Sequence, residues 1–140
     1  MKKLITIITL IFSSTLFAMN NGQILVDISG IDKVEGQLGI GLFNQETDFP
    51  QVDKAYQGVF LTLTEKNAQY TFSNLPYGEY AIAVFHDSNN NGKLDKNLLG
   101  IPKEGYGFSN NATATFGSPH FNEAKFKLEG EHHIEIKIKY

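Results

Sequence analysis

The feature that most constrains the fold is an alternation of apolar and polar residues that recurs in short segments. In the last eight residues, apolar Ile134, Ile136, Ile138 and Tyr140 alternate with polar His133, Glu135, Lys137 and Lys139. Because successive side chains of a β-strand point to opposite faces, this pattern predicts a strand with one buried face. Segments of this kind occupy 23–29, 37–43, 58–64, 69–73, 79–85, 125–128 and 133–140. Only a short turn is expected around 51–56 in place of a helix.

About seven to eight short strands in 140 residues predict an all-β fold, an antiparallel β-sandwich of the transthyretin-like or immunoglobulin-like kind. The turn Leu75-Pro76-Tyr77-Gly78, followed by Tyr80, resembles the hairpin of transthyretin-like and carboxypeptidase-regulatory-like sandwich domains. Pro and Gly supply the turn itself. We expect Leu75 to close one end of the core and the Tyr80 hydroxyl to bond backbone.

The first 18 residues predict a signal peptide. Lys2 and Lys3 form a positive start, an uncharged apolar run follows over 4–17, and Ala18 precedes a plausible cleavage site. The run is short for a membrane span, although a retained membrane anchor is the alternative. We therefore expect residues 19–140 to form one domain that is periplasmic or secreted in a bacterium, with no membrane insertion after cleavage.

Charge and composition argue against several classes of function. Acidic residues number 15 against 12 basic residues, and every basic residue is Lys. A nucleic-acid-binding protein normally has a basic surplus that includes arginines, so we expect no nucleic-acid partner. The absence of Cys removes disulfides and thiolate chemistry. Loss of Lys2 and Lys3 with the signal peptide makes the domain more acidic, which predicts no basic patch for anionic lipids.

The segment 87–95 has the spacing of a calcium-binding loop. A calcium ion takes six to eight oxygen ligands from alternate positions of such a loop. The oxygen donors expected here are the side chains of Asp87, Asn89, Asn91 and Asp95 and the backbone carbonyl of Lys93. Gly92 lies where the loop must turn sharply, and Leu94 is expected to anchor the loop to the core.

The pattern is incomplete, because its twelfth position is Leu98 where a calcium-binding loop has Glu. Glu104 is a candidate for a late carboxylate. Two carboxylates with two neutral amides predict weak binding, on the order of 10⁻⁴ to 10⁻³ M, and therefore a structural calcium ion. The alternative is an ordinary polar hairpin loop, since Asn, Asp, Ser and Gly are common in turns.

Two further features have competing interpretations. The glycine- and aromatic-rich segment 99–121 could display aromatic rings to a ligand, but we expect it to fold over the end of the sandwich. His86 and Asp87, with His120 as a possible partner, could serve an unrecognised enzyme. No established catalytic motif is present, so we expect no enzyme. His132 and His133 begin a predicted strand, point to opposite faces and are expected to face solvent.

The run Tyr80-Ala-Ile-Ala-Val-Phe-His-Asp-Ser-Asn-Asn-Asn-Gly-Lys-Leu-Asp95 is similar to an exported bacterial family named domain of unknown function 2141. The resemblance continues through 99–111, 116–121 and 124–126, and it covers about residues 22 to 140. It implies a transthyretin-like sandwich behind a signal peptide, without an established activity or catalytic residue. We therefore expect a non-catalytic binding or accessory domain for an unknown ligand. An envelope structural or assembly protein that pairs through an edge strand is the alternative.

Overall fold

The computed structural model describes residues 20–140, so the expected signal peptide lies outside the described residues. The elements are β1 (Asn21–Ser29), β2 (Gln37–Phe43), η1 (Val52–Lys54), β3 (Gln57–Thr62), β4 (Ala68–Pro76), β5 (Gly78–Asp87), β6 (Tyr106–Phe108), η2 (Ser109–Asn111), α1 (Phe121–Ala124), β7 (Phe126–Leu128) and β8 (Glu131–Lys137). None of the helices in this part of the chain is long and apolar enough to cross a membrane.

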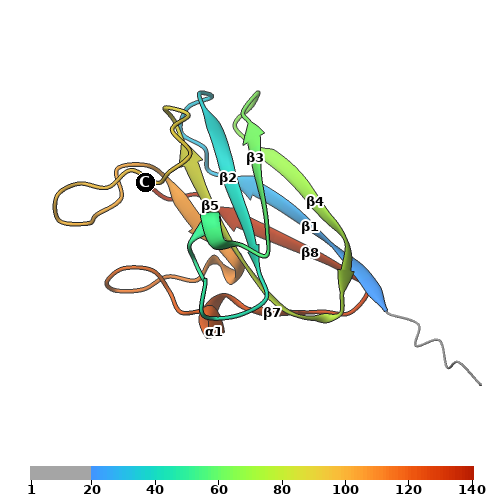
Figure 1. Ribbon diagram of the computed structural model, residues 1–140. Coiled ribbons are helices and arrows are strands. Elements are labelled where there is room, and N and C mark those ends of the chain that lie inside the picture. Colours follow the sequence, from blue (N-terminus) through green and yellow to red (C-terminus); the bar gives the residue numbers. More distant parts are fainter. Residues whose placement is uncertain (1–19) are drawn as a thin grey trace, which may run out of the picture.

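The strands form two sheets that face each other, as Figure 1 shows. One sheet has the order β4-β1-β8, and the other has the order β3-β2-β5-β6 with β7 paired to β5. The all-β sandwich predicted from the alternation is confirmed. One pairing differs from a fully antiparallel arrangement, because β1 and β8 run parallel. The alternation determines which side chains face inward, but it carries no information about strand direction.

The main core fills the space between the sheets with the apolar side of the predicted alternation. Ile24 and Val26 of β1 face Leu38 and Ile40 of β2, and all four side chains are fully buried. The central positions of β5 and β8 contribute Ile82, Val84, Ile134 and Ile136. Residues 20–140 thus contain both sheets and the core between them, so this part of the chain can be prepared as a folded unit.

A second apolar cluster covers the outer face of the five-stranded sheet. Ala81 and Ala83 of β5 lie there against Phe43, Phe108 and Phe121. Phe49 packs against all three of these rings, with centroid distances of 5.3, 5.9 and 5.9 Å. Strand β5 is therefore buried on both faces, as is its neighbour β2, in contrast to the half-buried strands β1 and β8 of the other sheet.

The β4–β5 turn has the expected packing. Leu75 is fully buried at one end of the core. The Tyr80 hydroxyl donates a hydrogen bond of 2.7 Å to the Pro76 carbonyl oxygen. Both sequence predictions for this hairpin are confirmed.

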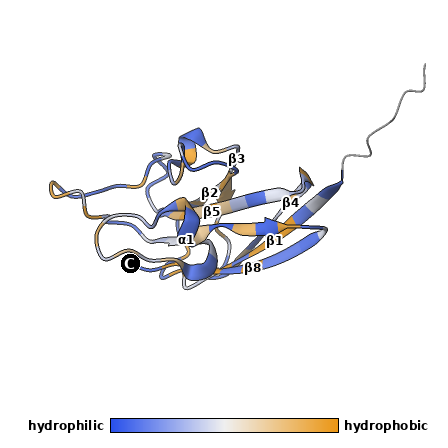
Figure 2. Cartoon of the chain, turned by 90° about the horizontal axis from the view of Figure 1, so that it is seen from below, coloured by the Kyte–Doolittle hydropathy of each residue, from blue (hydrophilic) through white to orange (hydrophobic). Residues whose placement is uncertain are grey.

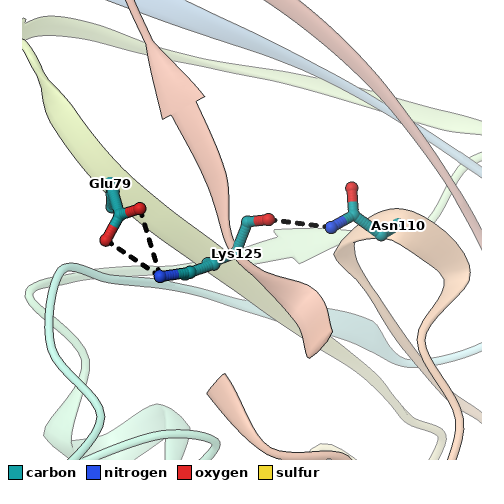
Figure 3. A network of polar contacts seen from close by, with 3 residues as sticks. All are labelled: Glu79, Asn110 and Lys125. Atoms are coloured by element: carbon teal, nitrogen blue, oxygen red, sulfur yellow. Dashed lines mark hydrogen bonds and ion pairs between the residues drawn. The ribbon is translucent and has the colours of Figure 1, made fainter. Parts of the chain in front are cut away.

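The chain that returns after β6 is attached to β5 by polar contacts. Ser109 Oγ accepts a hydrogen bond from the Ile82 backbone N–H at 2.8 Å and donates one to the Ala124 carbonyl at 2.6 Å. Figure 3 shows the neighbouring network, in which Asn110 Nδ2 donates to the Lys125 carbonyl at 2.9 Å. The Lys125 ammonium lies 3.1 Å from the Glu79 carboxylate. These contacts fix both ends of the loop 112–118.

Candidate functional site

The loop 87–95 begins at a buried carboxylate at the end of β5. Asp87 is fully buried, and its two oxygens accept three hydrogen bonds. The backbone N–H groups of Asn91 and Gly92 donate at 3.0 and 2.8 Å, and Gln37 Nε2 donates at 2.8 Å. Gly92 has φ 76°, which confirms the sharp turn expected at this residue. Asp87 thus organises the first half of the loop.

The second half of the loop is arranged around Asp95. Its two carboxylate oxygens accept hydrogen bonds from Asn89 Nδ2 at 2.7 Å and Asn91 Nδ2 at 2.9 Å. The bond from Asn91, followed by that from Asn89, lowers the pKa of the Asp95 carboxyl below its usual 3.8. The Asn91 side-chain oxygen in turn accepts the Lys93 backbone N–H at 2.9 Å. The four predicted side-chain ligands therefore form one connected cluster.

Glu104 holds the two ends of the loop together from the protein side. This carboxylate is buried; one oxygen accepts both the backbone N–H of Ser88 at 3.0 Å and its hydroxyl at 2.9 Å. The other oxygen accepts the Asp95 backbone N–H at 2.9 Å. From sequence, Glu104 was a candidate only as a late metal ligand. Its distance along the chain gave no sign that it bridges both ends of the loop.

The cluster has the oxygen donors that a hard cation needs, but few carboxylates. Within residues 20–140, no group of three or more His, Asp or Glu side chains is placed to hold a metal ion. A cation at this loop would take the carboxylates of Asp87 and Asp95, the amide oxygens of Asn89 and Asn91, and backbone oxygen. Both amide groups would rotate, because their nitrogens now face Asp95. The residues present fit a weak calcium site.

His86 is buried at the end of β5 with both ring nitrogens in hydrogen bonds. Nε2 lies 2.7 Å from the Glu35 carbonyl oxygen, which can only accept, so Nε2 carries the proton. In the neutral ring Nδ1, which lies 2.7 Å from the Tyr140 hydroxyl, accepts a hydrogen bond from it. Burial raises the pKa of the Tyr140 hydroxyl, which keeps it a donor. This geometry ties the C-terminal residue to the core.

The other histidines lie apart from His86. His120 precedes α1, which packs on the outer face of β5. His86 is an even-numbered residue of β5, and its side chain points to the inner face, as those of Ile82 and Val84 do. The structure thus does not bring these two residues together. His133 contacts Asp27 on the outer face of its sheet, as expected for an exposed position. His132 stacks on Phe126 with a centroid distance of 4.6 Å, so the expectation that it faces solvent is wrong.

A groove of about 460 Å³ lies beside the loop, on the outer face of the five-stranded sheet. It is lined by Pro50, Gln51, Val52, Asp53, Ala83, Val84, Phe85, Gly92, Lys93, Leu94, Lys96, Tyr106, Phe108 and Ser118. The floor comes from β5 and β6, one wall from the segment around η1, and the other wall from residues 92–96. Leu94 was expected to anchor the loop to the core, but it is half-buried and lines this groove.

The aromatic floor depends on a glycine in the neighbouring strand. Gly39 of β2 pairs with Phe85 of β5, and the Phe85 ring lies over it. A Cβ atom on Gly39 would lie 2.2 Å from that ring, so no larger residue fits without displacing it. Phe60 on the other side packs edge-on against Phe85 with a centroid distance of 6.1 Å. The alternation of β2 placed Gly39 on this face but did not indicate a groove.

The glycine- and aromatic-rich segment 99–121 divides into two parts. Phe108 and Phe121 are buried in the outer cluster, which confirms the expectation that the segment folds over the sandwich. Phe116 is 92% exposed, so the expectation is wrong for this ring. The difference follows from the anchoring contacts, which hold both ends of the loop 112–118 but not its tip.

Comparison with known proteins agrees with the resemblance found in the sequence. Residues 26–136 match a family described as an uncharacterized protein conserved in bacteria (DUF2141). The match covers most of the chain, and the chain belongs to this family. No curated protein and no solved structure matches the chain. The transthyretin-like subclass therefore stays a prediction.

We predict that Glu104→Gln lowers the free energy of unfolding by about 1–3 kcal/mol, because a neutral amide cannot accept all three hydrogen bonds in the same geometry. Urea denaturation of the domain measures this difference. The matched control is Glu65→Gln at an exposed position, for which a change within about 0.5 kcal/mol is expected. Equal stabilities of the two variants would contradict the role of Glu104 as the clamp of the loop.

Proposed function

We propose that this protein is an exported, non-catalytic binding domain whose ligand site is the groove beside loop 87–95. In this proposal the loop holds a structural calcium ion that stabilises one wall of the groove. The proposal rests on one observation: the loop and the groove have a segment in common, because Gly92, Lys93 and Leu94 of the loop also line the groove. Order in the loop therefore determines the shape of the binding site.

The groove has the size and lining of a small-molecule site. Such sites are concave, mostly apolar, and contain a few polar groups that orient the ligand. Here Phe85, Tyr106 and Phe108 form an aromatic floor, and Lys93 and Lys96 lie on one wall. Asp53 lies on the opposite side, so the basic groups outnumber the acidic one at the rim. This lining favours an apolar or aromatic ligand with a negatively charged group.

The calcium proposal is supported by the ligand spacing and by the side-chain cluster. Asp87, Asn89, Asn91 and Asp95 are already joined by hydrogen bonds, so a bound ion would replace contacts within one cluster. Neutral amides and only two carboxylates favour weak, extracellular-type affinity. Such an ion would stabilise the loop and would take no part in chemistry.

Export is supported by the positive start, the apolar run 4–17 and Ala18. We predict that expression of the full chain in a bacterium gives a periplasmic or secreted product that begins at Met19. Intact-mass spectrometry of that product checks the cleavage site. A product that retains Lys2 and Lys3 and sediments with membranes would favour the membrane anchor.

We predict that millimolar calcium raises the melting temperature of the domain above its value in EDTA, while equal magnesium does not. At ten times the dissociation constant, a ligand specific for the folded state adds about 1.4 kcal/mol, which corresponds to several degrees. Differential scanning calorimetry measures the shift. Protons compete with the ion for Asp95, whose pKa lies below 3.8, so the shift persists at about pH 5 and disappears under more acidic conditions.

The variant that tests the calcium loop is Asp95→Asn, which removes one carboxylate from a partly exposed position. We expect it to fold and to lose the calcium shift. Asp32→Asn changes an exposed aspartate outside the loop and should keep the shift. If the unmodified domain gives no shift, the loop is an ordinary hairpin and only the groove proposal stands.

We predict that an aromatic anion binds in the groove. The probe is 1-anilinonaphthalene-8-sulfonate, and two-dimensional NMR of the labelled domain maps its site through the amides of Gly92, Leu94 and Tyr106. Gln51→Trp places a large side chain at the exposed groove wall and should weaken binding about tenfold. Gln57→Trp, at an exposed position outside the groove, is the control. Shifts scattered over both sheets would contradict a specific site.

A further inference from the structure

Beyond the groove, the segment that follows loop 87–95 projects from the protein with an apolar tip. Leu98, Leu99 and Ile101 are 106%, 83% and 56% exposed. Figure 1 shows this segment extending away from the sheets, and Figure 2 shows hydrophobic colour at its end. Three large apolar side chains in one turn are thus turned toward solvent, away from either apolar cluster.

The tip is a turn that is ordered by side-chain and backbone hydrogen bonds. Asn97 Oδ1 accepts the backbone N–H groups of Leu99 and Ile101 at 2.9 and 3.0 Å. The Gly100 backbone N–H donates to the Asn97 carbonyl at 3.0 Å, and Gly100 has φ 77°. An antiparallel bridge between Lys96 and Pro102 closes the base of the turn. The backbone therefore holds the apolar side chains outward.

A second loop with an apolar tip projects from the same end of the molecule. In the loop 112–118 Phe116 is 92% exposed, and both ends of the loop are attached to the protein core through Ser109 and Asn110. Figure 1 shows the two loops projecting in the same direction, one above the other, on the side of the molecule away from the β4–β5 turn.

Lysines surround the bases of both loops. Lys93, Lys96 and Lys103 are exposed on the first, and Lys137 and Lys139 line a shallow hollow together with residues of the second. The stretches 96–102 and 112–118 contain no Asp or Glu. Asp95 is bonded to two amides, and Glu104 is buried. The exposed ionisable side chains of 93–103 are therefore lysines, while the carboxylates of Asp87, Asp95 and Glu104 lie beside them and offset much of their charge.

Acidic groups at this end lie away from the tips. Asp53 is on the groove wall, and Asp32 and Glu35 lie beside Tyr140 in a hollow that Lys33 and Lys103 also line. These acidic residues reduce the net charge of the whole end but do not belong to either projecting loop. The first tip therefore has lysines along its own stem, and the second has Lys137 and Lys139 from the C-terminal strand region beside its base.

We propose that these two loops dock the domain on an anionic lipid surface. The side chains of Leu98, Leu99, Ile101 and Phe116 would enter the boundary between headgroups and acyl chains, and the lysines would contact lipid phosphates. A stable protein partner normally covers about 800 Å² with matched shape. Two exposed tips on separate loops suit a fluid lipid surface, which can close around each tip, better than a rigid protein surface.

The test is co-sedimentation of residues 20–140 with vesicles of phosphatidylglycerol and phosphatidylethanolamine, compared with phosphatidylcholine alone. The buffer contains EDTA, so that the result does not depend on calcium. We expect binding to the anionic vesicles that falls with added salt. The triple variant Leu98→Ser, Leu99→Ser, Ile101→Ser should lower the partition coefficient about tenfold or more, because three inserted apolar side chains are lost.

Tyr77→Ser is the matched control, because Tyr77 is an exposed apolar residue of the β4–β5 turn. It should bind as the unmodified domain does. Circular dichroism melting shows that each variant is folded; all substituted side chains are solvent-exposed. A double variant, Lys96→Gln with Lys103→Gln, should reduce binding and weaken its salt dependence.

Failure of the unmodified domain to sediment with anionic vesicles overturns the proposal. Equal binding of the triple variant and the unmodified domain also overturns it, since the tips would then have no part in docking. Concentration-dependent self-association that the triple variant abolishes, without vesicle binding, would assign the tips to a second copy of the chain. None of these results bears on the ligand groove, which NMR mapping tests separately.

Discussion

The structure depends on strand β5 being buried on both faces. Its even-numbered residues, such as Ile82 and Val84, fill the space between the sheets, so the odd-numbered Ala81, Ala83 and Phe85 face outward. A strand with apolar side chains on both faces needs cover on the second face as well. The segment around η1 and the segment from β6 to α1 supply that cover from two sides. The groove is the part of this face that lies between the segment around η1 and residues 92–96, with β5 and β6 as its floor.

The end of β5 presents the opposite problem, because the buried residues there are polar. Burial of a polar group is costly unless it is hydrogen-bonded. His86 is satisfied by Glu35 and Tyr140, and Asp87 by Gln37 and its own loop. Among the described residues, every buried side-chain nitrogen and oxygen has a partner. These partners come from distant parts of the chain, so the polar groups at the end of β5 connect the 31–36 turn, the C-terminus and loop 87–95.

The sequence predicted those features that depend on local patterns. Alternation located the strands and their inward faces, as in Ile134 and Ile136, and the Asp-Asn spacing identified the loop that borders the groove. It could not predict the parallel pairing of β1 with β8, because pairing direction depends on the path of the whole chain. The role of Glu104 was missed for the same reason. Strand β6 was missed because Tyr106-Gly107-Phe108 lies within the glycine- and aromatic-rich segment 99–121, which was interpreted as a loop.

Loop 87–95 and the projecting turn that follows it are held in place together, because Glu104 bonds to Ser88 and Asp95 at the two ends of the loop. A flexible loop would lose conformational entropy whenever a ligand or surface ordered it, and that loss weakens binding. Here the buried carboxylates of Asp87 and Glu104 order the segment before anything binds. The hydrogen bonds of these buried carboxylates thereby preorganise the groove wall and the apolar tip. This accounts for two buried acids in a region whose exposed side chains are amides, lysines and apolar residues.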